Sequence, residues 1–100
     1  MITVNISNKN NEIHKINVLG HADYADYGKD IVCAGASTIV TTTVNACLKL
    51  DKDSIIYNYV DNGLVLDIVS NDMTTTKLVE NMIELLEELE NEYPKNIKVK

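Results

Sequence analysis

The stretch Asp30–Leu50, DIVCAGASTIVTTTVNACLKL, decides the fold because a strand and a helix compete for it. Its β-branched centre, Ser37–Val44, favours a strand by propensity. However, the segment is too long for one strand in a chain of 100 residues, and apolar residues recur along it at near-helical spacing. These residues are Val32, Ala36, Ile39/Val40 and Cys47. We therefore predict a helix whose small residues 34–36 pack closely against a sheet.

Alternating apolar and polar residues on both sides of this helix predict strands. Four segments show the alternation, in two pairs: 2–7 with 14–19, and 54–60 with 64–70. The first pair is joined by the turn-forming cluster Asn8–Asn11, and the second by Asn62-Gly63, which suits a tight type I′ turn. The pattern predicts two antiparallel hairpins.

Met73–Tyr93 is the clearest helix, and Pro94 ends it. Its predicted apolar stripe consists of Leu78, Met82, Leu85/Leu86, Leu89 and Tyr93. A short strand, Ile97–Val99, completes the order β-β-α-β-β-α-β. This order predicts a single α+β domain over residues 1–100, a two-layer sandwich with two helices packed on one face of a mostly antiparallel sheet.

The composition argues against several classes of partner. The net charge is −6 and there is no arginine, so no basic stripe is available to follow a phosphate backbone, and we expect no direct nucleic-acid binding. No apolar run approaches membrane-spanning length and no signal-peptide pattern is present, so we expect a cytoplasmic protein without membrane contact. In that reducing compartment the two cysteines are expected to be free thiols.

Cys33 is the strongest candidate for chemistry. With Asp30 as the N-cap it lies in the first helical turn, where the helix dipole favours a thiolate. The unpaired backbone N–H groups of that turn are also candidates to receive a developing oxyanion. The alternative is a small buried apolar residue.

His21 lies twelve positions before Cys33, at the end of a predicted strand. It can act as general base toward the thiol and then as acid toward the leaving amine, or it can be an ordinary loop histidine bonded to a carbonyl. The polar loop that joins the two residues favours nucleophilic chemistry.

Several neighbours have two interpretations each. Asp30 caps the helix or orients His21, and capping is favoured because a carboxylate near Cys33 opposes thiolate formation. Ser37, one helical turn beyond Cys33, donates near the nucleophile or bonds back into the helix.

The loop itself offers hinges or ordinary turns at Gly20 and Gly28. Tyr24 and Tyr27 pack on a substrate or cover the core, and Asp23 is most simply a solvated charge.

Cys47 is interpreted as structural, because on a continuous helix it lies about 21 Å from Cys33, too far for a disulfide. His14, His21, Cys33 and Cys47 lack the closely spaced pairs of zinc ligands, so no metal or other cofactor is expected.

The residues Gly20-His21-Ala22, Gly28, Asp30, Val32-Cys33-Ala34 and Ser37 together resemble the signature of the ribosomal-processing cysteine protease family Prp. The resemblance implies a bacterial homodimeric cysteine endopeptidase that removes the N-terminal extension of large-subunit ribosomal protein twenty-seven during ribosome maturation. It places the catalytic pair on Cys33 and His21, with support from Asp30, Ser37 and Ala34. It also implies a mobile loop that covers the site: Gly20, Ala22, Asp23, Tyr24, Tyr27 and Gly28.

Other functions are compatible with the same residues. One is a non-catalytic ribosome-associated binding module in which Cys33 is merely buried. Another is a thiol redox sensor, which the absence of a nearby resolving cysteine disfavours. Small-molecule thiol transfer is a third, although no cofactor motif supports it.

Overall fold

The computed structural model describes residues 1–26 and 28–100. Its elements are β1 (Ile2–Lys9), β2 (Glu12–Leu19), α1 (Ile31–Leu50), β3 (Ile55–Val60), β4 (Gly63–Ile68), α2 (Met73–Glu92) and β5 (Ile97–Val99). This order confirms the predicted β-β-α-β-β-α-β arrangement and the α+β class.

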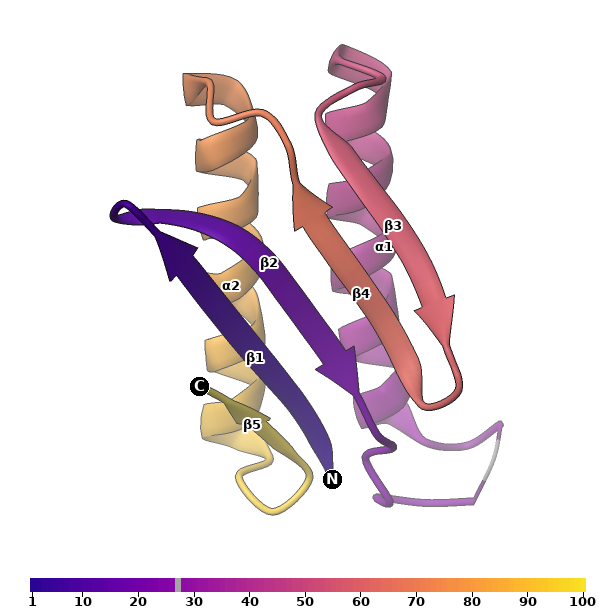
Figure 1. The fold of residues 1–100 in the computed structure, drawn as a ribbon. Helices are drawn as coiled ribbons and strands as arrows, with labels where there is room; N and C mark the ends of the chain where they lie inside the picture. Colours follow the sequence, from indigo (N-terminus) through magenta and orange to yellow (C-terminus); the bar gives the residue numbers. More distant parts are fainter. Residues whose placement is uncertain (27) are drawn as a thin grey trace.

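The strands form one sheet in the order β3-β4-β2-β1-β5. Both predicted hairpins are present, β2 pairs antiparallel with β4, and β5 pairs parallel with β1. The predicted type I′ turn at Asn62-Gly63 is wrong, because Gly63 is already the first residue of β4 and Asn62 does not have a positive φ. Figure 1 shows both helices on the same face of the sheet, which confirms the two-layer arrangement. The N-terminal end of α1 and the C-terminal end of α2 therefore lie at the same end of the molecule.

Helix α1 forms despite its β-branched centre because one face of it is buried. The buried residues are Val32, Ala36, Val40, Thr43, Val44 and Cys47. The hydroxyl of Thr43 donates to the carbonyl of Ile39 at 2.9 Å, so this buried polar group is satisfied within the helix. Burial of the apolar stripe outweighs the local preference for a strand.

The expectation that no segment approaches membrane-spanning length is wrong by one measure. Helix α1 has 20 residues and a mean hydropathy of 1.6 over its most apolar window, which is long and apolar enough for a membrane span by length and composition alone. A core helix meets the same criterion, and α1 contributes five residues to the hydrophobic core between sheet and helices.

Helix α2 buries a stripe that differs in part from the prediction. Met82 and Leu86 are buried as expected, but so are Thr75 and Val79. Leu85 is exposed, because the face that meets the sheet is rotated toward the smaller residues.

The small residues of α1 also have different neighbours from those predicted. A Cβ on Gly35 would lie 3.8 Å from the side chain of Leu89, so Gly35 faces α2 and not the sheet. Ala34 is exposed, and only Ala36 of the three is buried. The lack of bulk at Gly35 therefore allows the two helices to approach each other.

Candidate active site

Asp30 caps the N-terminus of α1, as the sequence predicted. Its Oδ1 atom accepts hydrogen bonds from the backbone N–H groups of Val32 and Cys33, each at 3.0 Å. The N–H of Ala34 donates to the carbonyl of Asp30 at 3.1 Å. The expectation of unpaired N–H groups for an oxyanion is therefore wrong for residues 32–34, because the cap already uses them.

The second carboxylate oxygen of Asp30 binds the loop that precedes α1. Its Oδ2 atom accepts from the N–H groups of Tyr24 at 3.0 Å and Ala25 at 3.3 Å. These bonds, with that from Cys33 the largest, lower the pKa of Asp30 below its ordinary value. One side chain thus joins the loop to the first turn of the helix, a role the sequence did not reveal.

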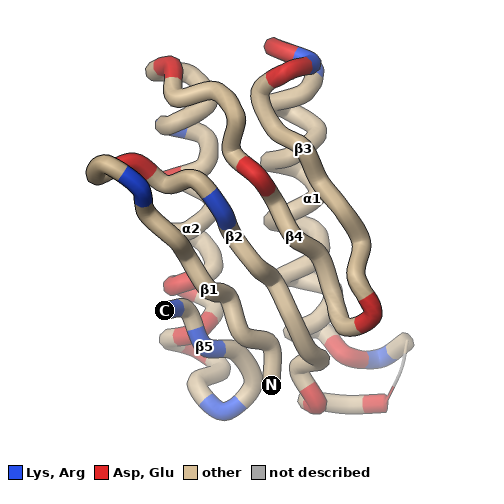
Figure 2. Tube along the Cα trace, viewed as in Figure 1, with Lys and Arg blue, Asp and Glu red and all other residues tan. Residues whose placement is uncertain are grey.

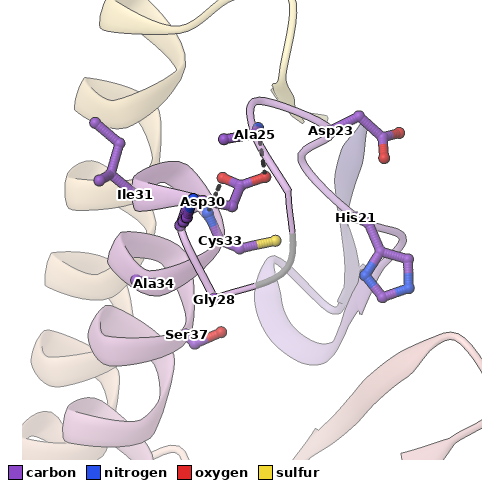
Figure 3. Close-up of a pocket in the computed structure, with 10 residues that line it drawn as sticks. His21, Asp23, Ala25, Gly28, Asp30, Ile31, Cys33, Ala34 and Ser37 are labelled. Carbon is purple, nitrogen blue, oxygen red and sulfur yellow. Dashed lines mark hydrogen bonds between the residues drawn. The ribbon is translucent and has the colours of Figure 1, made fainter.

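Cys33 is half-buried, and its sulfur points from α1 toward the loop (Figure 3). The backbone N–H of Ala22 donates to this Sγ atom at 3.4 Å. Ala22 itself is 1% exposed, and its carbonyl accepts a 2.9 Å hydrogen bond from the side-chain amide of Asn96. Sequence reasoning missed Asn96, which lies far along the chain in the turn before β5.

His21 is exposed and follows Gly20, whose positive φ of 92° ends the strand. In Figure 3 its ring points away from the Cys33 sulfur. The hydrogen bonds found in residues 1–26 and 28–100 include none between the His21 ring and this thiol. The imidazole and the thiol therefore belong to the same site without direct contact in this conformation.

A cavity of about 690 Å³ connects these residues. Its lining contains His21, Asp23, Ala25, Gly28, Lys29, Asp30, Ile31, Cys33, Ala34 and Ser37. The structure therefore brings together most of the residues singled out from the sequence. It adds Ala25, Lys29 and Ile31, which carry no pattern that would have marked them as site residues.

Three of the predicted loop residues lie outside the lining of this cavity. Ala22 is buried beneath it, and Gly20 is packed against the Met1 backbone. Tyr24 packs edge-on against Tyr93, with ring centroids 5.3 Å apart, so it contacts the end of α2. Tyr27 lies outside the described residues.

The exposed side of the loop also forms an ion pair, between the N-terminal ammonium of Met1 and Asp23 at 3.3 Å.

Ser37 is exposed in the cavity, and no hydrogen bond of its hydroxyl is found within residues 1–26 and 28–100. Both roles considered for Ser37 therefore stay predictions.

The second cysteine differs sharply from the first. Cys47 is 1% exposed, and burial raises the pKa of its thiol, with a further contribution from the charge of Asp72. Both cysteines are free. Within the described part of the chain, no group of three or more His, Cys, Asp or Glu side chains is placed to hold a metal ion.

Comparisons with known proteins agree on one family. The family model described as cysteine protease Prp matches residues 1–98. The ribosomal processing cysteine protease Prp of Staphylococcus aureus strain Mu50 is 38% identical over 103 residues, covering 99% of this chain and 97% of the relative. The protein of the same name from Bacillus subtilis strain 168 is 33% identical over 88 residues, covering 80% and 78%.

Solved structures give the same result. The S. aureus Prp protease in complex with a covalently linked product peptide is 36% identical, with a TM-score of 0.91, covering 100% of this chain and 98% of that one. The same protease with a substrate peptide has a TM-score of 0.85 at 35% identity, with the same coverage. With the fold, the cavity and these matches in agreement, the chain belongs to the Prp family of cysteine proteases.

Proposed function

We propose that this protein is an endopeptidase that uses Cys33 as nucleophile and His21 as general base. In this proposal it removes the N-terminal extension of large-subunit ribosomal protein twenty-seven during ribosome maturation. One observation carries the assignment: His21 and Cys33 line the same cavity, with Cys33 in the first turn of α1. The helix dipole favours the thiolate at that position, and the thiolate is the reactive form.

The reaction follows from these two side chains. His21 takes the proton of the Cys33 thiol, and the thiolate attacks the scissile carbonyl carbon to form a C–S bond. Collapse of the tetrahedral intermediate breaks the C–N bond, while the imidazolium of His21 gives its proton to the departing amine. Water then attacks the thioester, His21 accepts its proton and returns it to the sulfur, and the acid product leaves.

This mechanism requires His21 to approach the sulfur. The ring is exposed at the end of β2, and hydrogen bonds between catalytic groups are often formed only in the substrate complex. Movement of the loop over residues 22–29 would admit an extended peptide and then bring the two groups together. Opening it would break the bonds from Tyr24 and Ala25 to Asp30 and the bond from Asn96 to Ala22.

The charge of the loop suits a basic substrate segment. Figure 2 shows acidic residues on the loop between β2 and α1, where Asp23, Asp26 and Asp30 outnumber Lys29. The whole chain carries a net charge of −6, which attracts a cationic ribosomal protein over a distance of about a Debye length. The peptide complexes of the S. aureus relative support a peptide as the ligand of this site.

The proposed active form is a cytoplasmic homodimer, and β3 is the edge we assign to the second copy. β3 lies at the end of the sheet and has no charged residue between Ile55 and Val60. Ile56, Tyr57 and Tyr59 are exposed on it. An exposed strand edge without charge or proline is a template for pairing with another strand. A second acidic copy is repelled least at this uncharged edge.

The chain offers matched controls for a test of the catalytic pair, because it contains two cysteines and two histidines. Incubation with the extended ribosomal protein, read by product mass, should show cleavage by the wild type and by the Cys47→Ala and His14→Ala variants. Cys33→Ala should abolish cleavage, and His21→Ala should lower kcat by about 10²–10⁴-fold. Cleavage retained by Cys33→Ala would overturn the assignment.

A further inference from the structure

We propose that Asn96 is a positioning residue for Cys33, acting through Ala22; this inference rests on the proposed function. The contacts form a chain from the turn before β5 to the sulfur. The side-chain amide of Asn96 donates to the Ala22 carbonyl at 2.9 Å, and the Ala22 N–H donates to Cys33 Sγ at 3.4 Å. Asn96 is separated from Ala22 by 74 positions in sequence.

Asn96 is itself held on both sides of its backbone. Its N–H donates to the carbonyl of Tyr93 at the end of α2, at 2.9 Å. Its carbonyl accepts from the N–H of Ile2 at the start of β1, also at 2.9 Å. The side-chain amide therefore projects from a backbone fixed to a helix and to the sheet, which makes it a rigid support for the loop.

Ala22 is well suited to transmit this support. It is 1% exposed, so its backbone is enclosed as well as hydrogen-bonded. A backbone N–H binds an anionic acceptor more strongly than a neutral one, so the Ala22 N–H favours the thiolate over the thiol.

A purely structural tether is the competing explanation, and it makes different predictions. Loss of a tether alone would lower stability and leave the reactivity of the sulfur unchanged. Loss of a positioning residue lowers the reactivity of Cys33 even in a folded protein. The test therefore measures the thiol directly.

The experiment uses Asn96→Ala and Asn96→Asp in a Cys47→Ala background, so that Cys33 is the single thiol. Asn96→Asp keeps the side-chain shape but its carboxylate has no hydrogen to donate to Ala22. We expect the rate of iodoacetamide alkylation at pH 7 to fall about tenfold in both variants. A fall of this size corresponds to the loss of one charge-assisted hydrogen bond, that from the Ala22 N–H to the Cys33 thiolate. The midpoint of the rate against pH should move upward by about one unit. In peptide cleavage, kcat should fall while KM changes little.

Asn71→Ala is the matched control. The Asn71 side-chain amide also crosses between segments, donating to Glu12. The connection between β4 and α2, which contains Asn71, lies at the end of the molecule opposite the N-terminal end of α1 (Figure 1). This variant should leave alkylation and cleavage at wild-type values. If the Asn96 variants, folded by circular dichroism, alkylate at the wild-type rate with the same pH midpoint, the proposal is wrong.

A measurement on the unaltered residue covers the case in which the Asn96 variants do not fold. In ¹⁵N-labelled protein the Ala22 amide proton should shift with pH at the same midpoint as alkylation, and Cys33→Ser should remove that titration. An Ala22 amide that does not follow the thiol would overturn the proposal. Because alkylation needs no substrate, failure of the ribosomal-protein cleavage assay would overturn the proposed function and leave this test unaffected.

Discussion

Asp30 serves both the helix and the loop with one carboxylate, and Asp72 offers a comparison. Asp72 caps α2 in the same way, accepting from the N–H of Thr75 at 2.8 Å, but it binds no part of the site. The hydrogen bond from Thr75 is the main cause that lowers the pKa of Asp72. The two aspartates therefore share the capping role and differ in the loop contact.

Replacing each aspartate by alanine should separate the two roles. Asp30→Ala and Asp72→Ala should both lower the thermal unfolding midpoint at pH 7, because each removes a cap. Only Asp30→Ala should also change the rate of Cys33 alkylation, since only it releases the loop. Equal alkylation rates in the two variants would contradict a loop role for Asp30.

The pH dependence of these effects has a definite sign. The pKa of each carboxyl is lower in the folded protein than its ordinary value of 3.8, so its charged form stabilises the fold. That stabilisation is fully present above pH 3.8 and is lost as the pH falls through the still lower folded pKa. Thermal unfolding measured from about pH 7 to pH 2 should show that the difference in unfolding midpoint between the wild type and each alanine variant becomes smaller at the acid end.

Residues of the cavity that lie close together in the sequence were predictable, and a residue that reaches the site from a distant segment was not. His21, Asp30, Cys33 and Ser37 were recognisable because they lie within one short segment and their side chains carry the chemistry. Asn96 was not, because its role depends on a contact with a backbone carbonyl distant in sequence. No pattern in the sequence around Asn96 predicts such a contact.

At the scale of elements, packing decided what propensity left open. In α1 the apolar spacing predicted the helix correctly against a β-branched composition. In α2 the predicted stripe is correct except at Leu85, which is exposed. The buried face also includes Thr75 and Val79, which were not predicted. The approach of α2 to the sheet selects the buried face, and this approach depends on the whole fold.

The contact between the helices predicts a stabilising substitution. Gly35 is an interior helical residue, and an added Cβ would meet Leu89 at 3.8 Å, an ordinary contact distance. Gly35→Ala should therefore raise the free energy of unfolding by about 0.5–1 kcal/mol, because alanine loses less backbone entropy. Urea unfolding should show a higher midpoint with an unchanged slope.

Gly63→Ala provides the opposite case. Gly63 has a φ of 154°, and a Cβ there would collide with the carbonyl of Val18 on the neighbouring strand β2. This variant should unfold at lower urea concentration than the wild type. A Gly35→Ala protein that behaves like Gly63→Ala would show that the helices cannot accommodate one methyl group.

At the scale of the whole molecule, we expect two copies of the chain to associate through the edge strand β3. Tyr59 is 81% exposed there, and Leu50 at the end of α1 is 67% exposed. Light scattering after size exclusion should give a dimer for the wild type and for Leu50→Lys, and a monomer for Tyr59→Lys, because a charge blocks the strand edge. A dimeric Tyr59→Lys protein would place the interface elsewhere.

The parallel pairing of β5 with β1 joins residues 2–4 to residues 97–99. During translation, a nascent chain that has not yet reached this last strand has neither its partner for β1 nor Asn96 to hold Ala22. On the mechanism proposed here, the full reactivity of Cys33 is reached only after residues 96–99 have emerged from the exit tunnel and paired with β1.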